Sequence, residues 1–276
     1  MENVLLTAYV WKRQTAADLA YIHQKSERWI RTQIERASVP EQTLVPQATP
    51  VVVDMTFWGR SYGVCVFRSP TLKQNLWWKE SRTETPWLYA EGLRKLLSDG
   101  WVFTGATIDG KRGVAQVFEA CGIPVQYCQF HQQRAVTRRL TRRPKMEAGR
   151  ALRALALTMP RMTEDGFRKD LCDWHKHHST FLEERSYALH KKRGWEYTHR
   201  NIRTAYRSLA TNMPRLFTYQ KYADRHIPNT TNTLDGMFSQ LKNKLAVHRG
   251  LRRARRYKII SVLLLGKRKT ASQKFH

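Results

Sequence analysis

The chain has 276 residues, of which 49 are Lys or Arg and 22 are Asp or Glu, so its formal net charge is +27 at pH 7. This excess excludes an ordinary neutral metabolic enzyme, and a hydrophobic content of 41% is too high for a disordered basic tail. The composition therefore predicts a protein that buries a core and presents a cationic surface to a polyanion. Nucleic acid is favoured over an anionic membrane, because aromatic residues are scattered through the chain and neither end carries a basic amphipathic anchor.

The sequence predicts no membrane segment. Its longest apolar run, 259–265, is interrupted by Ser261 and is far shorter than the roughly 18 residues of a membrane span. The first residues lack the basic segment of a secretion signal. The four cysteines show no regular spacing and are typical of reduced thiols. We therefore expect a cytoplasmic protein, associated with the nucleoid.

Residues 1–39 contain two stretches with helical spacing, 15–22 and 26–37, separated by a polar turn. This pattern predicts a small helix-turn-helix in which Ser26 caps the second helix. The side chains expected to face a DNA groove are Arg28, Arg31, Thr32, Gln33 and Arg36. A helical hairpin packed on its neighbours is the alternative. Residues 40–50 contain three prolines and predict a linker.

Residues 51–145 predict the first part of an α/β core. Three β-rich runs separated by turn residues predict an antiparallel meander: 51–58, 62–67 and 74–79. Alternating helices and strands follow at 85–98, 101–108, 112–120 and 123–127. Together these elements predict a mixed α/β sheet.

Residues 146–228 hold no β-rich run and predict an all-helical insertion. Within it, Trp195 belongs either to the core or to a surface that stacks on an unpaired base. Residues 229–276 predict a last helix, beginning near Thr233, and a basic C-terminal tail.

Two basic clusters flank the insertion. The first contains Arg138, Arg139, Arg142 and Arg143, and the second contains Arg252, Arg253, Arg255 and Arg256. Charge runs are often solvated faces, but no acidic residue follows Asp235, so the second cluster needs an external anion to relieve its self-repulsion. We therefore expect both clusters to contact DNA phosphates.

Three aspartates stand where an α/β enzyme can place catalytic groups. Asp54 lies inside the first predicted strand, where Asp is disfavoured, and Asp109 ends the fourth, ahead of Gly110. If these strands are neighbours, two carboxylates meet at one edge and need a cation between them. Magnesium prefers oxygen ligands, and two such ions about 3.5–4 Å apart stabilise both oxygens of a phosphodiester displacement. Asp235, in the first turn of the last helix, is the candidate third acid. Taken alone, Asp109 could be a turn residue and Asp235 a helix N-terminal acid.

Four separated motifs resemble, in the same order, those of DDE transposases of the bacterial insertion-sequence and eukaryotic Mutator type. They are the strand with Asp54, the segments Thr107–Gly110 and Cys128–His131, and Asn229–Asp235 followed by Phe238–Lys242. The resemblance covers about residues 50–260. It implies a ribonuclease-H-like core split by a helical insertion, Mg²⁺ with Mn²⁺ as a substitute, and strand cleavage and transfer on double-stranded DNA at insertion-sequence ends. It also implies a homo-oligomer that holds two DNA ends.

The resemblance implies that Asp54, Asp109 and Asp235 are catalytic metal ligands. The family usually has Glu at the third position, and here the matching residue is Asp235, which is one methylene shorter. A catalytically impaired, transposase-derived DNA-binding protein is therefore the alternative function, and a nuclease acting on structured RNA is a third. Glu183 and Glu184 are fallback acids.

Cys128 and His131 allow three interpretations. The resemblance places them beside the active site, with His131 near the scissile phosphate. Plain packing is the second interpretation. A zinc site shared with Cys172 and His175 is the third and least favoured. The two remaining cysteines are expected to be buried: Cys65 and Cys121.

Overall fold

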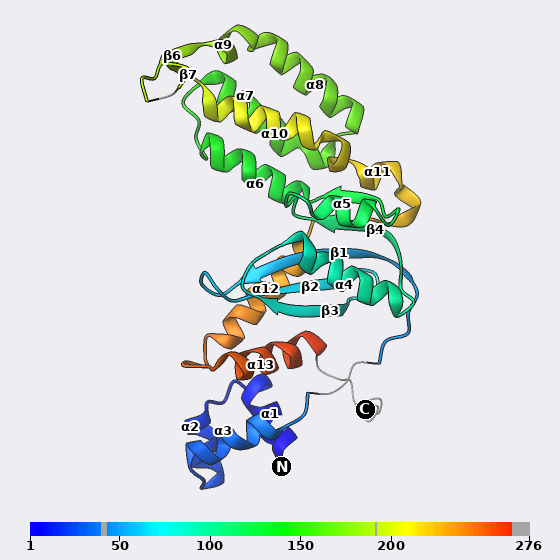
Figure 1. Ribbon diagram of the computed structural model, residues 1–276, viewed down its shortest axis with the longest axis vertical. Coiled ribbons are helices and arrows are strands. Elements are labelled where there is room, and N and C mark those ends of the chain that lie inside the picture. Colours follow the sequence, from blue (N-terminus) through cyan, green and yellow to red (C-terminus); the bar gives the residue numbers. More distant parts are fainter. Residues whose placement is uncertain (40–42, 191, 267–276) are drawn as a thin grey trace.

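The structure, a computed structural model, describes residues 1–39, 43–190 and 192–266. These residues form three tiers stacked along the long axis of the molecule (Figure 1). A five-stranded sheet lies in the middle, a helical tier covers one end, and a second helical tier with the N-terminus covers the other. The predicted linker residues 40–42 lie outside the described ranges.

The sheet has the strand order β3-β2-β1-β4-β5. Its strands are β1 (Ala48–Phe57), β2 (Gly63–Ser69), β3 (Gln74–Ser81), β4 (Val102–Ile108) and β5 (Val125–Tyr127). β1, β2 and β3 pair antiparallel, whereas β4 pairs parallel with both β1 and β5. The predicted mixed α/β sheet with its antiparallel meander is therefore confirmed.

β1 begins inside the segment that the sequence predicts to be a linker. Its first residue is Ala48, so Pro50 belongs to the strand. The pairing with β4 shifts register between Thr49 and Val51, and the pairing with β2 begins only at Val52. Proline has no N–H to donate, and an irregular point in the pairing can accommodate it. Pro50 therefore lies inside β1, although the sequence analysis assigned it to the linker.

The two faces of the sheet belong to different hydrophobic clusters, because successive strand residues point to opposite faces. Val51, Val53 and Met55 pack with α4 (Pro86–Ser98) and α5 (Val114–Glu119) in the first cluster, which continues into the helical tier. Val52 packs in the second cluster, with the N-terminal and C-terminal helices. α4 begins where Thr85 Oγ1 accepts a hydrogen bond from Leu88 N, directly before a proline in the first turn.

The helical tier begins without a loop after β5. It contains α6 (Gln129–Leu140), α7 (Glu147–Thr158), η1 (Met159–Arg161), α8 (Glu164–His177), α9 (Ser179–Glu183), α10 (Arg200–Leu216), α11 (Thr218–Lys221) and η2 (Ala223–Arg225). Its buried side chains, such as Phe167 and Phe217, are continuous with the first cluster. α6 therefore joins the sheet to this tier.

The prediction that residues 146–228 are all-helical is wrong at one place. β6 (Arg185–Tyr187) and β7 (Trp195–Tyr197) form an antiparallel hairpin at the far end of the tier (Figure 1). The guanidinium groups of Arg185 and Arg193 lie 4.1 and 4.2 Å from the centroid of the Trp195 ring, so cation–π contacts stabilise the hairpin. Strands of three residues are too short to show alternation in the sequence.

The second helical tier contains α1 (Glu2–Trp11), α2 (Ala16–His23), α3 (Glu27–Arg36), α12 (Asn232–Leu245) and α13 (Arg253–Leu265). α2 and α3 occupy the two predicted helical stretches, and Ser26 Oγ accepts a hydrogen bond from Trp29 N as predicted. Leu19, Ile30 and Ile34 are buried in the second cluster. The N-terminal helices therefore pack on the core and do not form a separate lobe.

The predicted basic C-terminal tail is a helix over residues 253–265. Ile259 and Ile260 are fully buried in the second cluster, and α13 packs against α1, α12 and β3. The apolar run 259–265, which is too short to span a membrane, therefore packs in the second hydrophobic cluster. Among the described residues, no helix combines the length and apolar character needed to cross a bilayer. Cys65 is buried as expected, whereas Cys121 is exposed, because it lies in the turn after α5.

Two helical glycines make a matched test of the packing between α4 and the sheet. A Cβ at Gly92 would lie 2.7 Å from ring atoms of both Phe67 and Trp77, whereas a Cβ at Gly236 meets nothing within 4 Å. We expect Gly92→Ala to destabilise the protein by about 1–3 kcal/mol, because the overpacking outweighs the gain in helix propensity. Gly236→Ala should stabilise it by about 0.5–1 kcal/mol. Urea unfolding of both variants measures the difference, and equal shifts would contradict this account of the packing.

Candidate metal centre

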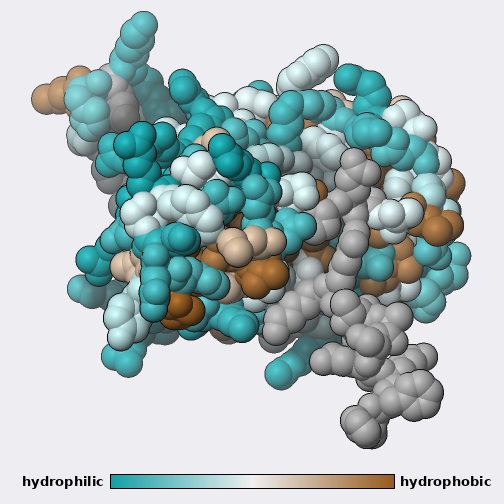
Figure 2. Space-filling view, turned by 90° about the horizontal axis from the view of Figure 1, so that it is seen from below, coloured by the Kyte–Doolittle hydropathy of each residue, from teal (hydrophilic) through white to brown (hydrophobic). Residues whose placement is uncertain are grey.

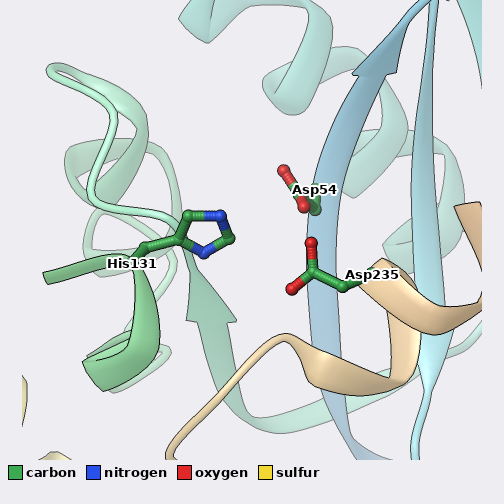
Figure 3. Close-up of side chains that lie close together, drawn as sticks. All are labelled: Asp54, His131 and Asp235. Carbon is green, nitrogen blue, oxygen red and sulfur yellow. The ribbon is translucent and has the colours of Figure 1, made fainter. Parts of the chain in front are cut away.

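Three side chains from distant parts of the chain converge at one end of the sheet. Asp54 comes from β1, His131 from the first turn of α6, and Asp235 from the first turn of α12. One ligand atom of each lies within 4.8 Å of those of the other two. The three side chains point toward a common space (Figure 3). Among the residues that the structure describes, this is the only group of three or more potential ligands so close together.

Asp54 lies in the interior of β1 and is only 7% exposed. The pleat of the strand turns its side chain to the same face as Val52, which is the face that α12 covers. Met55 N donates a hydrogen bond of 2.7 Å to Asp54 Oδ1. A carboxylate at this depth requires a cation, a proton or several donors to compensate for its lost hydration.

Asp109 lies beside Asp54 but outside the group of three. β1 and β4 pair parallel as far as Val52 and Thr107, and Asp109 directly follows the end of β4 at Ile108. Its negative charge acts on Asp54 and raises the pKa of that carboxyl. Gly110 has a φ of +85°, which lets the chain turn sharply, and Asp109 Oδ1 accepts a hydrogen bond of 2.9 Å from Lys111 N. The half-buried Asp109 is thus a charged neighbour at the rim of the site.

Thr231, which the sequence analysis assigned no role, connects the parts of the site. It is fully buried at the N-cap of α12. Its hydroxyl lies 3.2 Å from His131 Nδ1 and 3.3 Å from Asp235 Oδ2, and its N–H donates to Cys128 Sγ at 3.3 Å. A buried hydroxyl in contact with two candidate ligands fixes their orientation. Its only signal in the sequence is a run of Asn and Thr ahead of Asp235, which is also typical of a simple helix cap.

The segment before α12 is tied to the sheet and to α6. Thr107 Oγ1 donates to Pro228 O at 2.6 Å, and Gln129 N donates to Asn229 O at 2.9 Å. Asn229 Nδ2 also donates to Gln129 Oε1 at 3.1 Å. These bonds place the start of α12 against β4 and α6, although about 100 residues separate them in sequence.

The charges of the site are strongly coupled. Burial, and then the negative charge of Asp109, raise the pKa of Asp54 to about 7. The hydrogen bond with Cys128, followed by the charges of Asp54 and Asp235, raises the pKa of His131 to about 9. Burial raises the pKa of the Cys128 thiol, but hydrogen bonds from His131 and Thr231 outweigh this effect and leave that pKa lowered. Near pH 7 an imidazolium therefore stands beside the carboxylates and offsets part of their repulsion.

The donor set suits a divalent cation. The carboxylates of Asp54 and Asp235 are ligands for hard ions such as Mg²⁺ and Mn²⁺, whereas an imidazole suits transition metals better. His131 must lose its proton before it can bind a metal, so its coordination competes with the hydrogen bond to Cys128. Asp109 lies close enough for its charge to raise the pKa of Asp54, but it is outside this group of ligands.

The four-ligand zinc site is not formed within the described residues. Cys172 and His175 lie on α8, and the His175 ring stacks on Tyr206 at 4.4 Å. Neither residue joins the group that contains His131. The fallback acids also lie elsewhere, where Glu183 pairs with Arg203 and Glu184 pairs with His199.

The arginines predicted to contact DNA fall into two groups. Most have exposed side chains: Arg28, Arg31, Arg36, Arg138, Arg139, Arg142, Arg143, Arg252 and Arg253. Arg255 pairs with Glu35 and its side chain is only 10% exposed, and the guanidinium of Arg256 lies 5.0 Å from the Tyr62 ring centroid. Arg253 pairs with Glu80 at 3.0 Å. In the second basic cluster, only Arg252 is thus exposed without a partner among the described residues.

Comparison of the chain with protein-family models and with curated proteins gives no match. The function is therefore argued from the fold and from the geometry and charges of this centre.

We expect Asp54→Asn to stabilise the metal-free protein at pH 8, by about 4 kcal/mol. The carboxyl has a raised pKa in the folded state, so the folded protein binds more protons than the unfolded chain between about pH 4 and 7, and stability falls as the pH rises through this window. The advantage of Asn should shrink steadily on acidification and be nearly gone at about pH 4. Unfolding in EDTA at several pH values measures it, and a pH-independent difference would contradict the assigned burial.

We expect Thr231→Val to weaken Mn²⁺ binding about 10–100-fold, because the orienting hydroxyl is lost while the shape is kept. Thr231→Ser should restore most of the affinity. Thr230→Val is the control, since Thr230 is adjacent in sequence and is not among the three candidate ligands or their hydroxyl partner. Isothermal titration calorimetry measures the affinities. If the Thr231→Val variant bound Mn²⁺ as tightly as the unsubstituted protein, Thr231 would have no role in the centre.

Proposed function

We propose that the protein is a DNA transposase of the DDE type, which cleaves and transfers DNA strands at the ends of an insertion sequence. The observation that carries the proposal is the convergence of Asp54 and Asp235 with His131, with Asp109 nearby, directly after the end of β4. The mixed sheet that holds these residues is compatible with a ribonuclease-H-like core. A net charge of +27 supports a polyanionic substrate.

Asp54, Asp235 and Asp109 would hold Mg²⁺, with Mn²⁺ as a substitute. When bound, such ions stabilise the negative charge that develops on the oxygens of a phosphodiester displacement. The buried position of Asp54 keeps its carboxylate away from bulk water, and Thr231 orients Asp235. His131 carries a proton near neutral pH, so it offers a positive charge to a phosphate beside the centre.

The short third acid is compatible with activity. Asp235 lies one methylene short of the Glu usual in the resembled family, yet its carboxylate is within 4.8 Å of the other two ligand atoms. The bonds that tie residues 228 and 229 to β4 and α6 draw the start of α12 toward the sheet. This placement favours an active enzyme over the impaired, transposase-derived DNA-binding protein, which remains the second candidate because of the Asp itself.

The exposed arginines at the end of α6 supply contacts that do not depend on DNA sequence. Arg138 and Arg139 lie in the last turn of α6, and Arg142 and Arg143 follow it. Such side chains bind phosphates and position the duplex without reading it. Because two element ends must be held together, the proposal includes a homo-oligomer.

Nicking of a supercoiled plasmid that carries the coding region and its flanking DNA tests the proposal. We expect cleavage with Mg²⁺ or Mn²⁺ and none with EDTA. Asp54→Asn and Asp235→Asn should each lower the rate at least about 100-fold, because each removes a charged ligand. Asp99→Asn, at an exposed acid after α4 that pairs with Lys95, is the matched control.

Cleavage that is equal in Asp54→Asn and the unsubstituted protein, or that persists in EDTA, would refute the catalytic role. DNA binding without any metal-dependent cleavage would select the non-catalytic candidate. Preference for a structured RNA in the same assay would favour the nuclease.

A further inference from the structure

A basic cavity of about 940 Å³ lies between the N-terminal helices and the turn that joins α12 to α13. α3 contributes Arg28 and Arg31, while the turn and the start of α13 contribute Arg249, Arg252 and Arg255. Figure 2 views this end of the molecule, whose surface is mostly hydrophilic. Two basic segments that the sequence places at opposite ends of the chain thus form one site.

The charges of the cavity are only partly compensated. Glu27 pairs with Arg31, and Glu35 pairs with Arg255. Three arginines of the wall have no acidic partner in the described part of the chain: Arg28, Arg249 and Arg252. With five arginines and two glutamates, the wall keeps three uncompensated positive charges. A bound anion would relieve their mutual repulsion.

The wall of the cavity is also ordered by packing. His248 is 7% exposed, and its ring stacks on Tyr9 with the centroids 4.0 Å apart. Its Nδ1 atom is buried and has no hydrogen-bond partner within the described residues. Gly250, with a φ of +64°, allows the turn that presents the flanking arginines. The stacking of His248 on Tyr9 holds this turn against α1.

The residues that line the cavity indicate which part of DNA α3 would contact. A recognition helix enters a major groove about 12 Å wide with its basic face free. Here Arg28 and Arg31 share their cavity with Arg249 and Arg252 of the turn. These side chains are therefore placed to surround a backbone and contact phosphates, and not to read base edges.

α12 connects the cavity with the metal centre. Asp235 lies in its first turn, and the turn that lines the cavity follows Leu245, about 15 Å further along the helix axis. At about 3.4 Å per nucleotide along one strand, this length corresponds to about four or five base pairs. One continuous duplex can therefore reach both places.

We propose that this cavity binds the sugar-phosphate backbone of a DNA strand, independently of sequence, about four or five base pairs from the bond at the metal centre. The inference rests on the proposed function for the identity of the polyanion as DNA. The charge and shape of the cavity do not depend on it.

Binding of a fluorescently labelled duplex over a series of KCl concentrations, in EDTA, tests the inference. The triple variant Arg28→Ala, Arg249→Ala and Arg252→Ala should make the slope of log K against log salt shallower by about 2–3. The loss should be the same for duplexes of unrelated sequence. The control triple variant removes equal charge from exposed, unpaired arginines of the described chain outside the cavity: Arg82, Arg161 and Arg207. It should change the slope by less than about 1.

Equal slope changes in the two triple variants would overturn the inference, as would an unchanged slope in the cavity variant. A loss confined to one DNA sequence would assign base reading to these arginines and also overturn it. Displacement of the duplex by poly-glutamate at equal charge would assign the cavity to acidic protein segments and overturn it too. The binding assay runs in EDTA and the cleavage assay runs with Mg²⁺, so failure of binding and failure of catalysis are observed separately.

Discussion

The repulsion between the buried carboxylate of Asp54 and the half-buried carboxylates beside it is the constraint on which the structure of the centre depends. Asp54 lies inside β1, Asp109 directly follows the end of the neighbouring β4, and Asp235 lies in the first turn of α12. Without a compensating positive charge, the carboxylates repel one another, and this repulsion favours protonation of one of them. The pKa of Asp54 is raised for this reason as well as by burial. His131, held as an imidazolium by Cys128 and the carboxylates, offsets part of the repulsion in the metal-free protein. A divalent cation bound between these side chains would relieve the same repulsion, as the proposed function requires.

The packing of the molecule serves this convergence. α12 carries a stripe of Leu234, Phe238, Leu241 and Leu245 at spacings of three and four, which buries one face of the helix against the second cluster. Its start is fixed separately, by hydrogen bonds from the segment 228–231 to β4 and α6. Hydrophobic burial thus sets the direction of the helix, while polar bonds set the position of Asp235 along it. Thr231 makes some of these polar bonds and lies three residues before Leu234, where the buried stripe begins.

Much of the sheet and part of the centre could be predicted from the sequence, because they depend on local patterns. Runs of β-branched and aromatic residues bounded by turn residues mark β1 to β3, and Asp54 stands out since aspartate is rare inside strands. The proximity of Asp235 followed from a resemblance and not from periodicity. The β6–β7 hairpin was not predicted, because strands of three residues are too short to show alternation. Helix α13 was not predicted, because its sequence is highly charged and its buried face is recognisable only from its packing against α1 and β3. The contacts of Thr231 and the joint cavity of α3 and the α12–α13 turn depend on long-range packing, which no local pattern encodes.

The shared second cluster has a consequence for how this architecture can change. Leu19 and Ile30 of the N-terminal helices are buried with Leu234, the residue directly before the acid on α12. The N-terminal helices therefore share a core with the helix that carries Asp235, and α13 connects the two. α13 lies between these helices and α12, and it packs on both α1 and α12. Replacing the N-terminal helices would therefore expose apolar residues of α13, so changes that preserve this architecture are confined to surface positions that leave the shared core intact.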